Sequence, residues 1–166
     1  MVNYHQSFAP VVFEDSQLLI LGSMPGKVSL QASQYYAHPQ NLFWRIVSEV
    51  TGFDYPRDWT DKLNLLQCNK IALWDVCKEC QREGSLDSAI RNEVPNEINR
   101  LLSEYESIRI IAFNGKKTQQ LYDRYFSRKE GIIYKLLPSS SPANASQNYQ
   151  YKLSEWESVI KYGPSI

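Results

Sequence analysis

The sequence has few cysteines, no long apolar run and no excess of charge of either sign. Three cysteines among 166 residues are an odd number, and the first ten residues lack the basic and apolar regions of a signal peptide, so we expect no disulfide framework. No apolar stretch approaches the roughly 20 residues that span a bilayer. These absences favour a cytoplasmic protein with no membrane partner.

The charges cancel, with 18 Lys and Arg side chains against 18 Asp and Glu side chains. This balance excludes the overall positive field that many DNA-binding proteins carry, although it allows a local strip that binds phosphates. The hydrophobic content of 43% and the charged content of 22% are ordinary for a globular domain. We expect residues 1–166 to form a single domain, since no linker, internal repeat or low-complexity tract interrupts them.

The spacing of Cys77 and Cys80 is that of a metal or redox pair. A closed structural zinc site needs four ligands, and the remaining soft candidates are Cys68, His5 and His38. Free cysteines more often pack as small hydrophobic residues. The sequence therefore favours a structural role for the cysteines, and we predict neither a metal nor a cofactor.

Apolar runs separated by helical patterns organise the chain. The runs that predict buried strands are residues 18–21, 71–76, 108–113 and 132–137. The segments that predict helices are residues 41–52, 61–67, 96–105 with Pro95 at the first turn, 116–126 and 149–162, whereas polar residues 82–92 predict a loop. Strands that are apolar throughout indicate a three-layer α/β/α fold with a central four-stranded parallel sheet.

In a parallel sheet of this kind the ligand lies at the carboxyl ends of the strands. That edge is expected to collect residues 22–26, 74–77, 114–115 and 138–144. Residues 22–26, Gly-Ser-Met-Pro-Gly, bring backbone amides close to a ligand, although a plain strand-to-helix turn is an equally good interpretation of this loop alone. The loop has the spacing of neither a P-loop nor a Rossmann fingerprint.

Other segments give this loop a family context. Residues 35–44, Tyr-Tyr-Ala-His-Pro-Gln-Asn-Leu-Phe-Trp, resemble the segment after the first strand in mismatch-specific uracil- and thymine-DNA glycosylases. Residues 137–144 resemble the second motif of the uracil-DNA glycosylase superfamily, and residues 113–116 resemble a thymine-DNA glycosylase sequence. Residues 74–76 and 84–90 resemble the hypoxanthine-DNA (deoxyinosine) glycosylase branch.

The resemblance covers residues 18–144 with its motifs in the expected order, and it implies a monofunctional DNA glycosylase. Such an enzyme flips a deaminated base out of DNA, here hypoxanthine, and hydrolyses its N-glycosidic bond, which starts base-excision repair. The implied partner is DNA containing a deaminated base, and the protein is expected to be a monomer. The alternatives are a uracil or mismatch-specific glycosylase of the same fold, or a non-catalytic binder of lesion DNA or nucleotides.

Two departures from the family pattern move the expected chemistry to another residue. Met24 stands where the mismatch enzymes carry an Asn that positions water, and Leu137 stands where classical uracil enzymes have a His. Three cysteines also exclude the iron–sulfur branches, which need four. In the hypoxanthine branch an Asn at the position of Asn41 is implicated in catalysis, so the resemblance makes Asn41 the catalytic candidate; helix capping is the alternative role.

The resemblance also assigns the base pocket. Tyr36 is expected to stack on the flipped base, a role that Tyr35 could exchange with it, although an ordinary buried tyrosine is the rival. Asp75 could accept the N1–H of hypoxanthine as a carboxylate, or serve as a helix cap or ion-pair partner, and His38 is either structural or catalytic. The remaining pocket candidates are Gly22, Ser23, Met24 and Asn114, and the DNA-binding candidates are Gly26, Ser139, Ser140, Ser141 and Asn144.

Overall fold

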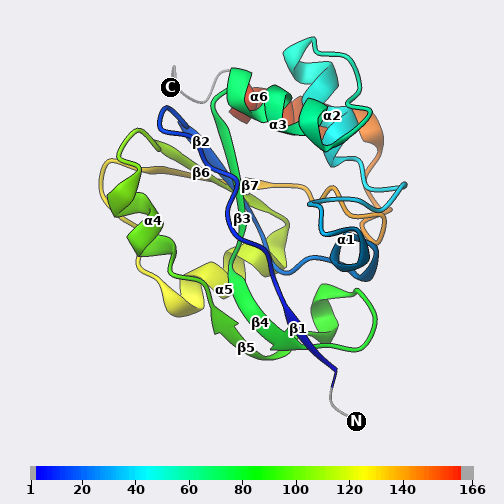
Figure 1. Cartoon of the computed structure of the whole chain (residues 1–166), viewed down its shortest axis with the longest axis vertical. Coiled ribbons are helices and arrows are strands. Elements are labelled where there is room, and N and C mark those ends of the chain that lie inside the picture. The colour runs from blue at the N-terminus through cyan, green and yellow to red at the C-terminus, as the bar shows by residue number, and fades with distance from the viewer. Residues whose placement is uncertain (1–2, 162–166) are drawn as a thin grey trace.

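The computed structural model describes residues 3–161, which are built around a parallel sheet (Figure 1). Its strands are β2 (Leu18–Gly22), β3 (Ile71–Asp75), β6 (Ile110–Asn114) and β7 (Ile133–Leu137). They are arranged in the order β3-β2-β6-β7, and every neighbouring pair is parallel, with Ile20 opposite both Leu73 and Ala112. The expected four-stranded parallel sheet is confirmed.

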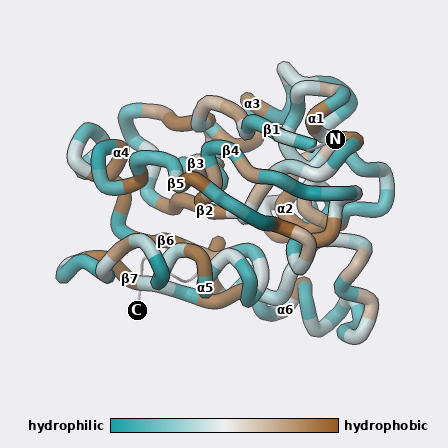
Figure 2. The backbone as a smooth tube through the Cα atoms, turned by 90° about the horizontal axis from the view of Figure 1, so that it is seen from below, coloured by the Kyte–Doolittle hydropathy of each residue, from teal (hydrophilic) through white to brown (hydrophobic). Residues whose placement is uncertain are grey.

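The side chains of each central strand alternate between two cores, because successive residues point to opposite faces of a sheet. Ile20 packs in the core beneath α2 (Phe43–Thr51), α3 (Trp59–Cys68) and α6 (Tyr149–Ile160). Leu19 and Leu21 pack on the other side beneath α4 (Ile98–Glu104) and α5 (Lys116–Tyr125). Figure 1 shows these helices on opposite sides of the sheet, and Figure 2 shows hydrophobic segments along β2 and β6. The protein therefore has three layers.

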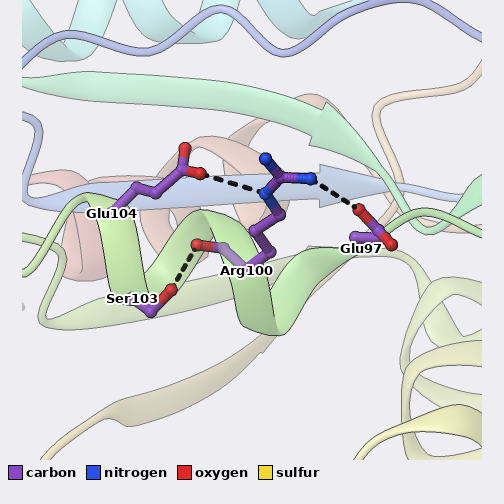
Figure 3. Close-up of polar contacts among 4 residues, drawn as sticks. All are labelled: Glu97, Arg100, Ser103 and Glu104. Atoms are coloured by element: carbon purple, nitrogen blue, oxygen red, sulfur yellow. Dashed lines mark hydrogen bonds and ion pairs between the residues drawn. The ribbon is translucent and has the colours of Figure 1, made fainter.

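Charged side chains at helical spacing form ion pairs on the outer face of α4 (Figure 3). Arg100 lies between Glu97 and Glu104, with nitrogen–oxygen distances of 3.5 and 3.1 Å, and all these side chains are exposed. Exposed ion pairs of this kind contribute about 0–1 kcal/mol each. The apolar face of α4, rather than these pairs, anchors the helix to the sheet.

A second sheet, which the sequence patterns did not predict, lies beyond the carboxyl end of β3. It contains β1 (Tyr4–Gln6), β4 (Cys77–Gln81) and β5 (Arg91–Pro95), all antiparallel in the order β1-β4-β5. The prediction of a loop over residues 82–92 was wrong at its end, where β5 begins, and a short 3₁₀ helix, η1 (Asp87–Ala89), also falls within it. The residues of β5 are mostly polar and outside the core, so only pairing with β4 reveals the strand.

Helix boundaries differ from the predicted ones for local reasons. Pro95 ends β5, an edge strand, instead of opening a helix, and α4 begins only at Ile98. Helix α3 begins before the predicted residue 61, because the Asp58 side chain accepts the backbone N–H of Asp61 and caps the helix. A short helix, α1 (Lys27–Ala32), was not predicted, and residue 162 of the last predicted helix lies outside the described residues. Within residues 3–161 no helix is both long and apolar enough to span a membrane.

Candidate active site

A cavity of about 630 Å³ opens at the carboxyl edge of the parallel sheet. The ends of β2, β3 and β6 form its floor, and segments 35–41, 85–88 and 138–144 contribute to its walls. Every predicted site residue lines it: Gly22, Ser23, Met24, Gly26, Tyr36, Asn41, Asp75, Asn114, Ser139, Ser140, Ser141 and Asn144. The fold thus brings together residues up to 122 positions apart in the sequence, from Gly22 to Asn144.

Gly22 and Asp75 are cross-strand neighbours at the floor of this cavity. A Cβ atom added to Gly22 would lie 2.4 Å from Asp75 Oδ1 and 3.1 Å from the Tyr36 hydroxyl oxygen. Contacts that short are not tolerated, so only glycine lets the carboxyl group and the phenol approach the strand this closely. The glycine of the first loop therefore makes room for two polar groups.

The Asp75 carboxyl group is almost fully buried, with 3% of the residue exposed. Its Oδ2 atom has no hydrogen-bond partner within residues 3–161, nor does the Tyr36 hydroxyl. Desolvation, with a contribution from nearby Asp87, raises the pKa of Asp75 to about 7, and Arg82 partly opposes the shift. Neither the helix-capping nor the ion-pair role expected as an alternative for Asp75 is seen among these residues.

Asp87 and Arg82 complete the electrostatic surroundings, and neither was selected as a site residue from the sequence. Asp87, on η1, accepts a 2.6 Å hydrogen bond from the Ser23 hydroxyl, and burial raises its pKa. Arg82 is buried beside the loop and donates to the Pro25 carbonyl. The resemblance of residues 84–90 to the hypoxanthine branch was the one sequence signal that pointed toward Asp87.

Tyr36 is held in an unusual backbone conformation at the cavity wall. Its φ angle is +53°, a left-handed value that is rare for a bulky residue and occurs mainly where function or packing imposes it. The ring stacks on Phe43 with centroids 4.2 Å apart and planes 18° apart. Burial raises the pKa of Tyr36 far above its ordinary value, so the hydroxyl keeps its proton. Tyr35 is buried in the core and donates its hydroxyl proton to the Ala9 carbonyl.

Asn41 combines a capping contact with a position on the cavity wall. Its Oδ1 atom accepts the backbone N–H of Phe43 at 3.0 Å, at the start of α2. Because that N–H needs an acceptor, the carboxamide orientation is determined, and the Nδ2 group is the donor left for the cavity. His38, on the same wall, uses Nδ1 to accept the backbone N–H of Gln40 at 3.1 Å.

Two reciprocal hydrogen bonds join β6 to residues 138–144, the serine-rich loop. Asn114 Nδ2 donates to the Ser140 hydroxyl at 2.9 Å, and Ser140 N donates back to Asn114 Oδ1 at 2.9 Å. Ser140 is fully buried, and its carbonyl accepts the N–H of Leu42 at 3.0 Å. Ser140 therefore holds the loop against β6 through its hydroxyl and N–H, and against the start of α2 through its carbonyl.

The outer part of the same loop is braced by its own side chains. The Ser139 hydroxyl accepts the N–H of Ser141, and the Ser141 hydroxyl accepts the N–H of Ala143, at 3.1 and 3.2 Å. Asn144 Nδ2 donates to the Ser139 carbonyl, while the buried Lys152 donates to the Asn144 carbonyl at 2.6 Å. These bonds brace the loop at the cavity mouth.

The cysteines form no metal site with other side chains in the described part of the chain. Within residues 3–161, no group of three or more His, Cys, Asp or Glu side chains could hold a metal ion. Cys77 and Cys80 are buried and Cys68 is exposed. Burial raises the pKa of Cys77 to about 12, so in the absence of a metal this side chain is a thiol.

A three-layer fold with a cavity at the carboxyl edge of its parallel sheet is typical of doubly wound α/β proteins, which bind ligands at that edge. Residues 10–160 match the model of the uracil DNA glycosylase superfamily, and the chain belongs to that superfamily. The expected superfamily, fold and enzyme class, a DNA N-glycosylase, are confirmed.

Similar proteins match the chain along nearly its whole length. A relative from Methanosarcina barkeri (strain Fusaro / DSM 804), named Hypoxanthine DNA glycosylase, is 39% identical over 157 residues, covering 94% of this chain and 98% of the relative. A relative of the same name from Methanosarcina acetivorans is 40% identical over 160 residues, with coverages of 95% and 98%. The solution NMR structure of a candidate uracil DNA glycosylase from Methanosarcina acetivorans has a TM-score of 0.83 and 39% identity, covering 95% and 97% of the two chains.

Proposed function

We propose that this protein removes hypoxanthine from deoxyinosine in DNA by hydrolysing the N-glycosidic bond. The observation that carries the proposal is the cavity wall formed by Tyr36 and Asn41, which offers an aromatic face and a carboxamide donor at the sheet edge. Two relatives at about 40% identity, both named Hypoxanthine DNA glycosylase, support this choice of base. In this proposal residues 1–166 act as one monomeric domain inside the cell, without a metal or cofactor.

The base must leave the duplex to reach such a cavity. An extruded nucleotide would enter between the serine-rich loop and segment 35–41, with its base against the ring of Tyr36. Stacking on an aromatic ring contributes about 1–3 kcal/mol and depends little on base identity. Because Phe43 already supports Tyr36 from behind, the ring needs no rearrangement to receive a base.

The bond cleavage passes through a state in which the sugar resembles an oxocarbenium ion and the base gains negative charge. Donors aimed at that charge lower the barrier. The Asn41 Nδ2 group can donate to the base or hold the attacking water, and its geometry is fixed by the bond from Phe43. The buried Met24 of the first loop offers no such hydrogen bond. The Asn41 carboxamide therefore supplies the hydrogen bond to the base or to the water.

The serine-rich loop is proposed to hold the DNA backbone next to the extruded nucleotide. Ser139, Ser141 and Asn144 lie at the mouth of the cavity, where small polar groups and amides suit phosphate oxygens. Ser140 acts through the position of the loop, since its hydroxyl is already bonded to Asn114. Gly26, at the start of α1, borders the cavity on the opposite wall.

A panel of duplexes tests the proposal. Duplexes containing a single hypoxanthine, uracil or xanthine are incubated with the protein, and abasic sites are revealed by alkali. We expect alkali-labile sites at hypoxanthine, and no strand break before alkali. Faster cleavage at uracil would show that uracil, and not hypoxanthine, is the preferred base. Binding to the inosine duplex without cleavage of any duplex would show that the protein is a lesion binder.

A further inference from the structure

Asp75 is a polar group of the cavity floor to which the proposed chemistry gives no role. Its Oδ1 atom lies against the backbone of Gly22, and its Oδ2 atom is buried without a partner in the described residues 3–161. The Tyr36 hydroxyl, buried on the other side of Gly22, is equally unpartnered there. Two unsatisfied polar groups at the floor of one cavity point to a ligand that supplies their hydrogen bonds.

We propose that Asp75 acts as a neutral carboxylic acid that donates a hydrogen bond to the departing base. The inference rests on the proposed glycosylase function and assigns the protonation state and role of one residue in it. In hypoxanthine the N1–H donor and the C6 carbonyl acceptor are adjacent. A neutral carboxyl group matches both, because its O–H donates to O6 and its carbonyl oxygen accepts N1–H.

The surroundings of Asp75 favour its neutral form. No Lys, Arg or His nitrogen forms an ion pair with it among residues 3–161. The ionisable groups around it are Tyr35 and Tyr36 on segment 35–41, Cys77 on β4, Asp87 on η1 and Arg82 after β4. The tyrosines and the thiol are neutral, and Asp87 opposes a second negative charge. Arg82 alone favours ionisation, and burial outweighs it, which leaves the pKa of Asp75 about 7.

Hydrolysis of the N-glycosidic bond favours the neutral form of Asp75. During hydrolysis the C1′–N9 bond breaks with its electron pair passing to the purine, and a water oxygen bonds to C1′. One proton of that water is released and the purine takes up a proton, giving neutral hypoxanthine and an abasic deoxyribose. The negative charge that develops on O6 strengthens a hydrogen bond from a neutral acid, whereas an ionised Asp75 would repel it. Asp75 keeps its proton throughout.

This arrangement does not by itself reject adenine. A neutral acid can also donate to N1 of adenine and accept from its amino group. The role assigned to Asp75 is therefore stabilisation of the leaving base, and the lactam edges of uracil and xanthine fit it equally. Discrimination among these bases must come from other walls of the cavity.

The test compares Asp75→Asn and Asp75→Ala in single-turnover cleavage of an inosine duplex between pH 6 and 8, with enzyme in saturating excess. Asparagine has the same shape beside Gly22 and offers a donor and an acceptor at every pH. The wild-type rate should fall about tenfold from pH 6 to pH 8 as Asp75 loses its proton. Asp75→Asn should remove that decline. The single-turnover rate of Asp75→Ala should be about 10²-fold below that of the wild type at pH 6.

A second measurement does not depend on activity. In protein labelled with ¹³C at the aspartate carboxyl carbons, the Asp75 resonance is assigned by its absence from Asp75→Asn, and its titration gives the pKa directly. We expect it to be protonated at pH 6. Ionisation of Asp75 already at pH 6 overturns the inference, as does a decline in rate that persists in Asp75→Asn, or an Asp75→Asn variant as inactive as Asp75→Ala.

These outcomes separate the inference from the function on which it rests. If the wild type cleaves no lesion duplex while the ¹³C titration finds Asp75 neutral at pH 6, the proposed function is wrong, and with it the role in base departure. If the wild type cleaves the inosine duplex but Asp75 is ionised at pH 6, the function stands and the inference falls.

Discussion

The Asp75 carboxyl group rests directly on the backbone of Gly22, the residue opposite it on the neighbouring strand. A Cβ atom on Gly22 would approach Asp75 Oδ1 to 2.4 Å. This relationship explains why the first loop begins with glycine even though it provides no catalytic side chain. The glycine determines how deep the floor of the cavity lies.

Gly22→Ala should therefore damage both stability and cleavage. The methyl group must displace Asp75 or the strand, and overpacking of this kind costs about 1–3 kcal/mol. Chemical denaturation measures the first effect and single-turnover cleavage the second. Gly26→Ala is the matched stability control, because its Cβ would meet Ser85 at 3.5 Å, an ordinary contact. If Gly22→Ala is as stable and as active as the wild type, the close contact has no functional meaning.

Two substitutions should separate the capping role of Asn41 from its role as a donor in the cavity. Asn41→Ala removes both the acceptor for the Phe43 N–H and the free donor, so it should lose about 1 kcal/mol of stability. Its cleavage rate should fall about 10²-fold or more, with much of the DNA affinity retained. Thermal unfolding, single-turnover rates and binding to an inosine duplex measure these effects.

Asn41→Asp is the control, because a carboxylate still accepts the Phe43 N–H but cannot donate. It should keep the stability of the wild type and lose the rate. An Asn41→Asp variant that cleaves normally would contradict the donor role of Nδ2.

Ser140→Ala should loosen the loop at the cavity mouth. The change leaves Asn114 Nδ2 buried without its acceptor, which costs about 1–3 kcal/mol. Urea denaturation gives the stability, and a double-mutant cycle with Asn114→Ala should show coupling between the two residues. Ser146→Ala, at an exposed position on the rim of the cavity, should change stability by no more than about 0.5 kcal/mol. Additive effects of the two buried substitutions would show that the reciprocal bonds do not act as a unit.

Stability should depend on pH through Asp75. Its pKa is raised from 3.8 to about 7 in the folded state, so below pH 4 both folded and unfolded chains carry the proton and folding has no extra cost. As pH rises toward 7, the unfolded chain ionises while the folded protein does not, and the free energy of unfolding decreases. The decrease reaches at most about 4 kcal/mol.

Asp75→Asn should remove this part of the pH dependence. Denaturation of both proteins at pH 4, 5.5 and 7 measures it, and the stability of the variant relative to the wild type should increase across the series. A constant difference between the two proteins would contradict a raised pKa for Asp75.

The apolar strands and the order of the motifs were predictable because their signals are local. The run Leu18–Gly22 is buried on both faces and ends in a glycine, so the strand and its carboxyl edge follow from neighbouring residues alone. The same rule placed ten of the twelve site residues at one edge, whereas Tyr36 and Asn41 were assigned from the family resemblance. Residues 91–95, by contrast, carry a polar pattern, and they form a strand only because β4 lies beside them.

The sequence by itself determined the layered fold, the sheet edge that carries the site and the family, since apolar runs and motif order are properties of the chain. Only the tertiary structure decided which polar groups remain available at that edge. The Ser140 hydroxyl is already bonded to Asn114, whereas the Asn41 Nδ2 group has no hydrogen-bond partner within residues 3–161. Burial between distant segments also raises the pKa of Asp75 to about 7, because desolvation depends on how those segments pack around it.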